Sequence, residues 1–220
     1  SQGPALGSAI HAAVAAGATH VLTVDQDSSF PDDYVQQLLA CERSAQRQGL
    51  RPGAVGAVEF SGLHHSGHFS DGVMVVQESI QSGTLFAATA LAEVGGFDER
   101  LVIDAVDTDV CLRLQCAGWD VCVAPVGFEH ALGDGHFVRF LGRRVWSSRH
   151  APLRRYYITR NGIVVLRRHA RRHPRWALVY LRRLLVATWL SVREGGPEVR
   201  AAVREGLADG WRRRLGKRPA

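Results

Sequence analysis

The feature that most constrains the fold is an apolar, β-branched run that ends abruptly in two carboxylates. The run is His20-Val21-Leu22-Thr23-Val24, and Asp25-Gln26-Asp27 follows it directly. Such a run is typical of a buried strand, and buried charge is costly unless something pairs it. Ligands of α/β sheets collect beyond the carboxyl ends of the strands. Two acids there can hold a divalent cation against a diphosphate. For this pattern alone, an ordinary polar turn is an equally good interpretation.

Strand-like and helix-like segments alternate along the chain, which indicates an α/β sheet with crossovers. We expect a loop over 61–72, and we expect Pro125 to end the last strand. From Phe137 onward the pattern is helical and rich in arginine, with an interruption at Pro174. The expected strands are 20–24, 53–60, 73–76 and 120–124. The expected helices include 4–18, 31–48 and 107–117, and a short apolar stretch over 83–88 is followed by a small helix to Val94.

Composition narrows the class of protein. The 220 residues suffice for one domain with a sizeable core plus an appendage, and the net charge is +6 with Lys217 as the only lysine. Arginine suits bidentate phosphate recognition, although codon bias in a GC-rich genome explains the enrichment equally well. The four cysteines form no CxxC pair, which favours a reducing, cytosolic compartment. The chain begins at Ser1 midway through a helix-like segment, so we expect an N-terminal portion to be missing.

A second acidic group comprises Asp104, Asp107 and Asp109. Asp107 lies near the positive end of an expected helix, where it is either a cap or a general base that accepts a proton from a hydroxyl. Asp109 and Arg113 are four residues apart and can form an ion pair that braces the helix. Asp104 is a candidate for a further brace. His130, after the strand over 120–124, becomes a plausible third metal ligand if it lies near two carboxylates.

Basic and aromatic residues are mixed over 154–161 in a helical pattern. A phosphate or sugar clamp is one interpretation, with guanidinium groups on a diphosphate and a tyrosine on the sugar. The other is a basic amphipathic helix that packs its tyrosines inward. The candidate residues are Arg154, Arg155, Tyr156 and Arg160.

The segment 176–192 is strongly apolar, but Arg182 and Arg183 interrupt it, so a transmembrane span is not expected. Tryptophans at both ends and flanking arginines favour a helix lying in a membrane interface. Packing on the domain or on a second subunit is the alternative. Nucleic-acid binding is disfavoured because the arginines of this tail interleave with apolar residues.

Together these segments resemble the family 2 glycosyltransferases, and within them the bacterial rhamnosyltransferases. The resemblance covers most of residues 1–170, with the matching words in the family's order. They are Val24-Asp25-Gln26-Asp27-Ser28, Gly95-Gly96-Phe97-Asp98-Glu99, Ile103-Asp104-Ala105-Val106-Asp107-Thr108-Asp109 with Cys111-Leu112-Arg113, His130 with Gly133, and the segment from His150 to Asn161.

The resemblance implies a GT-A fold, a nucleotide-diphospho-sugar transferase sheet with helices on both faces. Residues 1–170 would form the catalytic domain, truncated at its N-terminus, and 171–220 a basic amphipathic helical region. It implies an inverting hexosyltransferase that uses dTDP-L-rhamnose and builds cell-surface polysaccharide or O-antigen on a lipid-linked acceptor. Such an enzyme would be cytoplasmic and peripheral on the inner face of the bacterial plasma membrane.

The resemblance also implies roles for individual residues. Asp107 would be the catalytic base, and Mg²⁺ or Mn²⁺ would be held by Asp25, Asp27 and His130. Apart from the resemblance, we predict that the residues that bind substrate are Asp25, Asp109, Arg154, Arg155, Tyr156 and Arg160. The chain departs from the family in two ways. It lacks the first strand-and-loop segment that binds the nucleotide base, and it has Val106 before Asp107 where many relatives outside the rhamnosyl group have glutamate. A truncated, non-catalytic transferase that docks to a membrane or partner is therefore the alternative.

Overall fold

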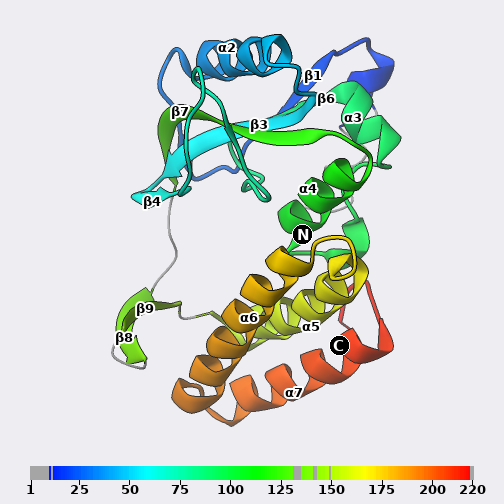
Figure 1. Ribbon diagram of the computed structural model, residues 1–220. Coiled ribbons are helices and arrows are strands. Elements are labelled where there is room, and N and C mark those ends of the chain that lie inside the picture. Colours follow the sequence, from blue (N-terminus) through cyan, green and yellow to red (C-terminus); the bar gives the residue numbers. More distant parts are fainter. Residues whose placement is uncertain (1–9, 11, 131–134, 141–142, 149, 219–220) are drawn as a thin grey trace. The chain divides into compact units, whose positions relative to one another are not determined.

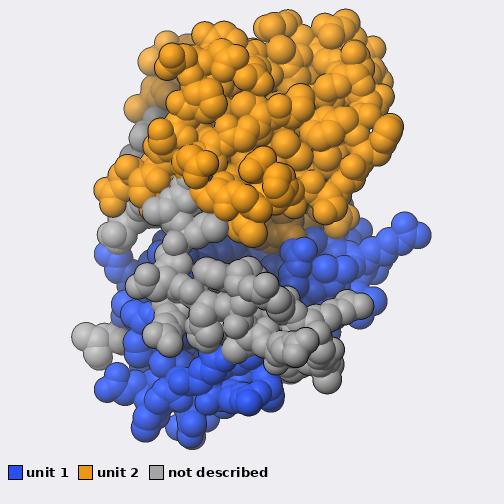
Figure 2. Space-filling model, turned by 90° about the vertical axis from the view of Figure 1, so that its left-hand side faces the viewer, with its two compact units in different colours: residues 1, 100–105, 132–220 blue, residues 2–99, 106–131 orange. Residues whose placement is uncertain are grey.

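The computed structural model describes residues 10, 12–130, 135–140, 143–148 and 150–218, and only the backbone from 130 to 148. The chain divides into two compact units, coloured separately in Figure 2. The sheet unit comprises residues 2–99 and 106–131. The helical unit comprises residues 100–105 and 132–220, so a short loop from the middle of the chain belongs to the C-terminal unit.

The sheet unit is built on a mixed β-sheet (Figure 1). Its central path runs β1-β6-β3-β7-β2, with β4 on β3 and β5 on β7. The pair β3–β7 is parallel, whereas the other described pairs of this sheet are antiparallel. The elements are β1 (His20–Thr23), β2 (Ser28–Ser29), α2 (Tyr34–Arg47), β3 (Pro52–Phe60), β4 (Leu63–His64), β5 (Met74–Val75), β6 (Thr84–Ala87), α3 (Ala88–Glu93), α4 (Val106–Cys116) and β7 (Asp120–His130).

Helices cover both faces of this sheet because successive strand residues point to opposite sides. On one face, Val55 and Cys122 pack against α2 through Leu38. On the other, Val121 and its neighbours pack against α3 and α4. Figure 1 shows α2 and α4 on opposite sides of β3 and β7. The predicted α/β class with helices on both faces is therefore confirmed, while the GT-A assignment remains a proposal.

Most predicted elements of this unit are confirmed, with shifts at their ends. The helix expected from residue 31 begins at Tyr34. The expected loop over 61–72 contains the two residues of β4. Of the helix expected over 4–18, residues 10 and 12–15 are helical, and residues 4–9 and 11 lie outside the described part.

The prediction that Pro125 ends a strand is wrong, because β7 continues to His130. Proline cannot donate a hydrogen bond to a neighbouring strand, so it is tolerated where the ladder is irregular. Such an irregularity is present here: Ala57 pairs with Ala124, but Glu59 pairs with Gly127, which leaves Pro125 within a register shift.

The helical pattern expected from Phe137 is also wrong over its first part. Residues 135–148 contain an antiparallel pair, β8 (Gly135–Phe140) and β9 (Arg143–Ser148), with Phe137 opposite Trp146 and Val138 opposite Val145. Both strands contain aromatic and β-branched residues, which are common in strands.

The helical unit also contains η1 (Glu99–Leu101), whose first residue belongs to the sheet unit, and three long helices. These are α5 (Pro152–His169), α6 (Pro174–Glu194) and α7 (Pro197–Arg212). Each begins with proline, which fits the first turn of a helix because its missing N–H has no partner there. The predicted interruption at Pro174 is therefore confirmed as a helix start. The expected division at residue 170 stays a prediction.

Candidate functional site

The predicted acidic pair occupies a tight turn between β1 and β2. The Ser28 N–H donates to the Asp25 carbonyl at 3.2 Å, which closes the turn. Ser82 ties the turn to the chain before β6: its Oγ accepts from the Asp25 N–H at 3.0 Å and lies 2.7 Å from Ser28 Oγ. Asp25 is partly exposed and Asp27 is exposed. Both carboxylates therefore lie where solvent and ligands can reach them.

The backbone places His130 beside this turn. It pairs with Ser28 in the β2–β7 ladder, so the last residue of β7 lies opposite the residue that follows Asp27 in the chain. The His130 side chain lies outside the described part. Among the described residues, no group of three or more His, Cys, Asp or Glu side chains is arranged to hold a metal ion. The two carboxylates have the hard oxygen donors that Mg²⁺ and Mn²⁺ prefer, so the donor chemistry at this turn fits the predicted cofactor.

The segment 78–83 connects the acidic turn to the start of α4. At one end, Ser82 binds the turn as described. At the other, Glu78 accepts a hydrogen bond from Thr108 Oγ1 at 2.7 Å, and Ser79 O lies 3.7 Å from Cys111 Sγ. This segment of six residues therefore contacts both the acidic turn and helix α4, which carries Asp107 and Asp109.

Asp107 lies in the first turn of α4 and is partly exposed. Its Oδ1 accepts from the Thr108 N–H at 2.8 Å, and the positive end of the helix favours its charged form. Asp109 differs, because its side chain is fully buried and pairs with Arg113 Nε at 2.8 Å. The predicted i, i+4 ion pair is confirmed. Burial of Asp109 supports a structural role rather than contact with substrate.

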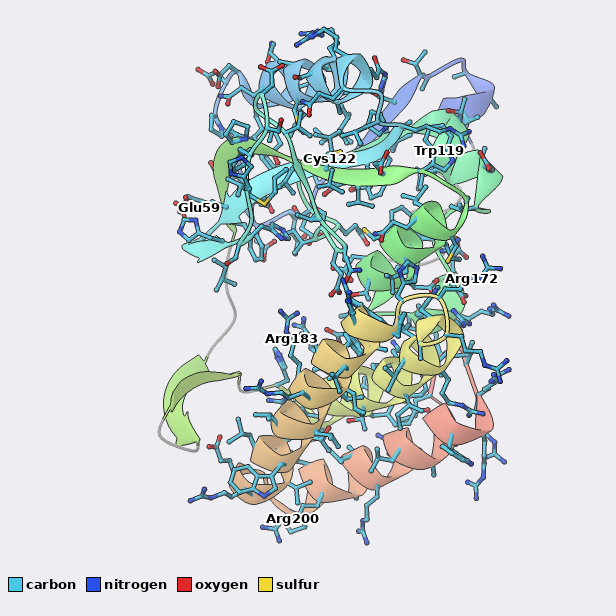
Figure 3. All side chains as sticks on the ribbon, viewed as in Figure 1. Glu59, Trp119, Cys122, Arg172, Arg183 and Arg200 are labelled. Carbon is cyan, nitrogen blue, oxygen red and sulfur yellow. The ribbon has the colours of Figure 1, made fainter. Side chains whose placement is uncertain are left out.

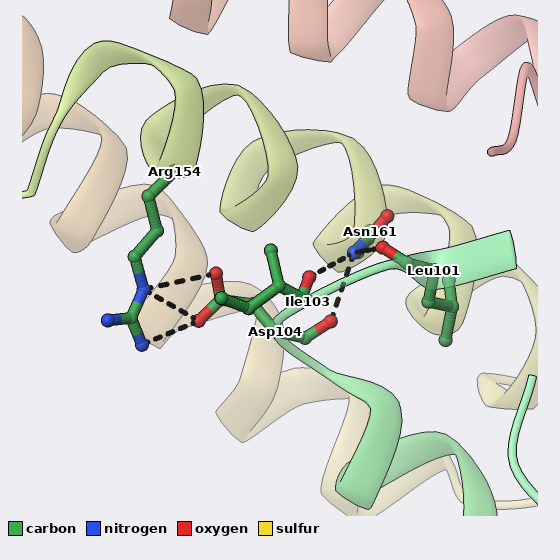
Figure 4. Close-up of polar contacts among 5 residues, drawn as sticks. All are labelled: Leu101, Ile103, Asp104, Arg154 and Asn161. Carbon is green, nitrogen blue, oxygen red and sulfur yellow. Dashed lines mark hydrogen bonds and ion pairs between the residues drawn. The ribbon is translucent and has the colours of Figure 1, made fainter. Parts of the chain in front are cut away.

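The loop that precedes α4 is strained and held in place by α5 (Figure 4). Three of its residues have positive φ without being glycine: Val102 at 70°, Asp104 at 65° and Ala105 at 61°. Asn161 Nδ2 donates to the carbonyls of Leu101, Ile103 and Asp104 at 2.8, 2.7 and 3.0 Å. Through these hydrogen bonds, α5 directly fixes the backbone conformation of the loop.

Two arginines of α5 also bind this loop. Arg154 Nη2 lies 3.1 Å from Asp104 Oδ1, so the brace suggested for Asp104 is present. Arg160 is 1% exposed and its Nη2 donates to the carbonyls of Arg100 and Leu101 at 3.1 and 3.0 Å. Its Nη1 bonds to Gly216 O. The guanidinium of Arg160 is therefore engaged by backbone, which supports a structural role for it.

Arg155 and Tyr156, the remaining residues of the predicted ligand clamp, are both buried. Arg155 is buried, and this burial lowers the pKa of its guanidinium. Tyr156 is buried and donates to Asp209 Oδ2 at 2.9 Å, so it packs inward, as in the second interpretation. Tyr156 and Arg160 both line a cleft of about 1060 Å³ in the helical unit. Its other lining residues are Leu153, Glu205, Ala208, Asp209, Arg212, Arg214, Leu215, Lys217 and Arg218.

Sequence reasoning missed Ser82, Glu78 and Asn161. For Ser82, the signal was its position before a glycine and an apolar strand, which is typical of a turn. No local sequence pattern indicates the role of Glu78, because its hydrogen-bond partner Thr108 is 30 residues away. Asn161 belongs to a segment for which a ligand clamp and an inward-packing helix were both considered, and its side chain binds a loop of the protein itself.

The geometry defines a mixed α/β protein in which a partly exposed acidic turn and an acidic helix start share one connecting segment. A comparison with known protein families gives no match. The chain is similar to the dTDP-rhamnosyl transferase RfbF of Shigella flexneri, with 30% identity over 166 residues, 70% of this chain and 55% of that protein. The chain thus spans about half the length of this curated relative.

Proposed function

We propose that this chain carries the catalytic part of an inverting glycosyltransferase with a GT-A fold. The donor would be a nucleoside diphospho-sugar, in first place dTDP-L-rhamnose, and the acceptor a lipid-linked or polysaccharide hydroxyl. The observation that carries the proposal is the segment 78–83, which contacts both the Asp25–Asp27 turn and the start of α4. The relative's name supports the choice of donor.

The chemical problem is the departure of a nucleoside diphosphate, on which negative charge develops as the sugar–oxygen bond breaks. Mg²⁺ or Mn²⁺, when bound by Asp25 and Asp27 with His130 as the predicted third ligand, would neutralise that charge. The Ser82 hydroxyl keeps the acidic turn in one conformation, so that the carboxylates need not reorganise as charge develops.

Asp107 would accept the proton of the attacking acceptor hydroxyl. A positioned general base typically contributes about 10²–10⁴-fold in rate. Its partly exposed position at the helix start lets an acceptor reach it, and the helix end keeps it charged and ready to accept a proton. A single displacement follows, which inverts the sugar carbon without a covalent enzyme intermediate.

Arg154 and Arg155 remain candidates for holding a diphosphate, of the donor or of a lipid carrier. The exposed part of Arg154 is compatible with this role, because nearly half of its side chain stays accessible while it pairs with Asp104. The expected location at the inner face of the bacterial plasma membrane follows from a lipid-linked acceptor and remains part of the proposal.

Binding of dTDP tests the metal site without requiring turnover. We expect calorimetry on this chain to show dTDP binding that requires Mn²⁺ and disappears with a chelator. Asp27→Asn should weaken this binding at least about tenfold, because it removes one of two charged ligands. Asp32→Asn is the matched control, since Asp32 is an exposed aspartate five positions away. Nucleotide binding that ignores both the metal and Asp27 would refute the proposed site.

Transfer from dTDP-L-rhamnose tests the base. Asp107→Asn should abolish transfer and leave Mn²⁺-dependent dTDP binding within about twofold, because the base acts on the acceptor and not on the donor. Turnover that survives in Asp107→Asn would rule out this residue as the base.

A further inference from the structure

Contacts within the helical unit bind its segments to one another. Trp176, at the start of α6, is buried and lies edge-on to His169 of α5 with ring centroids 6.4 Å apart, so this end of the apolar segment 176–192 packs inward. No helix among the described residues is long and apolar enough to cross a membrane. The segment that follows α7, residues 213–218, is also bound to this unit, and we call it the C-terminal strap (red in Figure 1).

The C-terminal strap is bound at two points. The Gly216 N–H donates to the Arg100 carbonyl at 2.7 Å, and the Gly216 carbonyl accepts from Arg160 Nη1. The Arg218 N–H donates to the Tyr157 hydroxyl oxygen at 2.9 Å. The first of these points connects the strap to the strained loop that precedes α4, and the second connects it to α5.

The Arg100 carbonyl is held by two donors at once. It accepts from the Gly216 N–H at 2.7 Å and from Arg160 Nη2 at 3.1 Å, while Arg160 also donates to the Gly216 carbonyl. The loop, the strap and α5 therefore form a closed ring of three hydrogen bonds. Two of these bonds come from a charged, buried guanidinium, and such bonds are stronger than those between neutral groups.

The strap also supports the two tyrosines against which the loop packs. Val102 has a φ of 70°, which a β-branched residue rarely adopts, and it packs against Tyr156 and Tyr157. The Arg218 guanidinium lies over the Tyr156 ring, 5.2 Å from its centroid, and the Arg218 N–H binds the Tyr157 hydroxyl. The strap and the most strained residue of the loop therefore contact the same two rings.

From these contacts we infer that the C-terminal strap positions Asp107, the proposed general base, with Gly216 as a positioning residue. The loop ends at Ala105, and Asp107 is the second residue of the helix that follows, so the conformation of the loop determines where α4 begins. Residues at positive φ relax when their surroundings no longer hold them. A base acts only within hydrogen-bond reach of the proton it accepts, so a small displacement lowers the rate. This inference rests on the proposed function and extends it to the end of the helical unit.

Gly216 is the strap residue on which these bonds depend. Its φ of 94° lies in the region where glycine is favoured and where asparagine is the side chain tolerated best. A Cβ at this position would meet nothing within 4 Å. A β-branched substitution therefore acts through the backbone rather than through a clash, because it turns the N–H and the carbonyl away from Arg100 and Arg160.

Cleavage by endoproteinase Asp-N tests the inference without requiring turnover. This protease cuts before aspartate, so it reports on the Ile103–Asp104 bond, and the strap contains no aspartate. We expect Gly216→Val to speed cleavage of this bond at least about tenfold, because the loop opens more often. Gly216→Asn should stay within about threefold of the parent. Lys217→Val is the matched control and should stay within about twofold, because the exposed Lys217 side chain has no partner among the described residues.

The Trp119–Asp120 bond at the start of β7 is the internal control (Trp119 is labelled in Figure 3). Its cleavage rate should not change, because it lies in the sheet unit, where the Asp120 N–H donates to the Arg51 carbonyl at 2.7 Å. The inference is overturned if Gly216→Val leaves the Ile103–Asp104 bond as slow to cleave as in the parent. It is also overturned if both bonds are cut faster to the same extent, since that would mean general unfolding.

Transfer from dTDP-L-rhamnose then separates positioning of the base from mere support of the loop. Gly216→Val should lower kcat at least about tenfold and leave Mn²⁺-dependent dTDP binding within about twofold, because the acidic turn is unchanged. Gly216→Asn should restore most of the lost rate. A loosened loop with an unchanged kcat would overturn the positioning role. If the parent itself transfers no sugar, the proposed function fails instead, and the cleavage rates still decide whether the strap fixes the loop.

Discussion

Asn161 illustrates how one side chain determines the conformation of a whole loop. A non-glycine residue at positive φ costs on the order of 1–3 kcal/mol, and a β-branched residue such as Val102 rarely adopts this conformation. Three such residues within four positions persist only if their surroundings hold them. The Asn161 amide bonds to three carbonyls and accepts from Arg160 Nε at 2.9 Å, so every polar atom of this buried side chain is used.

We expect Asn161→Ala to lower the free energy of unfolding by roughly 2–4 kcal/mol, because buried carbonyls lose their donor. Asn161→Asp is the informative companion, since it keeps the acceptor for Arg160 but cannot donate to the loop. It should destabilise at least as much as alanine at neutral pH. Urea titration measures both. If the aspartate variant were as stable as the parent, donation to the loop would not be what holds it.

Asp104 provides a test that depends on pH. Burial raises the pKa of its carboxyl, and the hydrogen bond and charge of Arg154 only partly offset this. When an acid has a higher pKa folded than unfolded, its contribution to stability is largest below the unfolded pKa. That contribution declines as the pH rises through the folded pKa. The unfolding free energy of the parent protein should therefore decline above about pH 4, and the Asp104→Asn variant should lack the part of this decline that comes from Asp104.

At neutral pH the asparagine variant should be no less stable than the parent, even though an ion pair is lost. Urea titrations at several pH values, with Asp32→Asn as an exposed control, measure the difference. A loss of more than about 1 kcal/mol at pH 7 would mean that the pair with Arg154 outweighs desolvation.

At the scale of elements, α5 and α7 pack unusually closely. A Cβ at Gly206 would lie 2.6 Å from the Tyr156 carbonyl oxygen, and one at Gly210 would lie 2.7 Å from that of Arg160. With Ala202, which is also buried, these residues recur every four positions along α7. Glycine within a helix costs about 1 kcal/mol relative to alanine, and the close approach of the two backbones explains why it is kept here.

We expect Gly206→Leu to destabilise the protein by about 3 kcal/mol or more, because the side chain must push the α5 backbone away. Gly206→Ala should destabilise less, since the gain in helix propensity offsets part of the clash. Gly196→Ala is the control: a Cβ there meets nothing within 4 Å, and its φ of −71° suits any residue. A Gly206→Leu protein with unchanged thermal unfolding would contradict this packing.

The elements also show what the sequence could predict. Strands β1 and β3 and helices α2 to α4 were predictable because local period and turn residues agree with the fold. The continuation of β7 through Pro125 was not, because it depends on a register shift opposite β3. The acidic turn was predictable from the apolar run of five residues over 20–24 that directly precedes it. The link through residues 78–83 was not, because hydrogen bonds between distant residues leave no local pattern.

At the scale of the whole molecule, the loop over 100–105 belongs to the helical unit, although the residues before and after it in the chain belong to the sheet unit. It leaves the sheet unit after Glu99 and returns to it at Val106, yet its carbonyls are bound by α5 of the helical unit. A cut of the chain at one position therefore cannot separate the two units without removing part of one. All four cysteines lie in the sheet unit, so their thiols report on its opening alone.

Thiol labelling of the native protein should show one fast and three slow cysteines. Cys41, Cys111 and Cys122 are buried, and burial raises their pKa values to about 11, 12 and 12, which leaves little reactive thiolate at pH 8. Cys116 is only partly buried, so it should react first. Mass spectrometry after iodoacetamide treatment should locate the first label there, and Cys116→Ser should remove the fast phase. The slow labels should appear at the rate at which the sheet unit opens, and all four thiols should react rapidly in guanidinium. Fast labelling of Cys111 in the native protein would show that α4 detaches while the rest of the sheet unit stays closed.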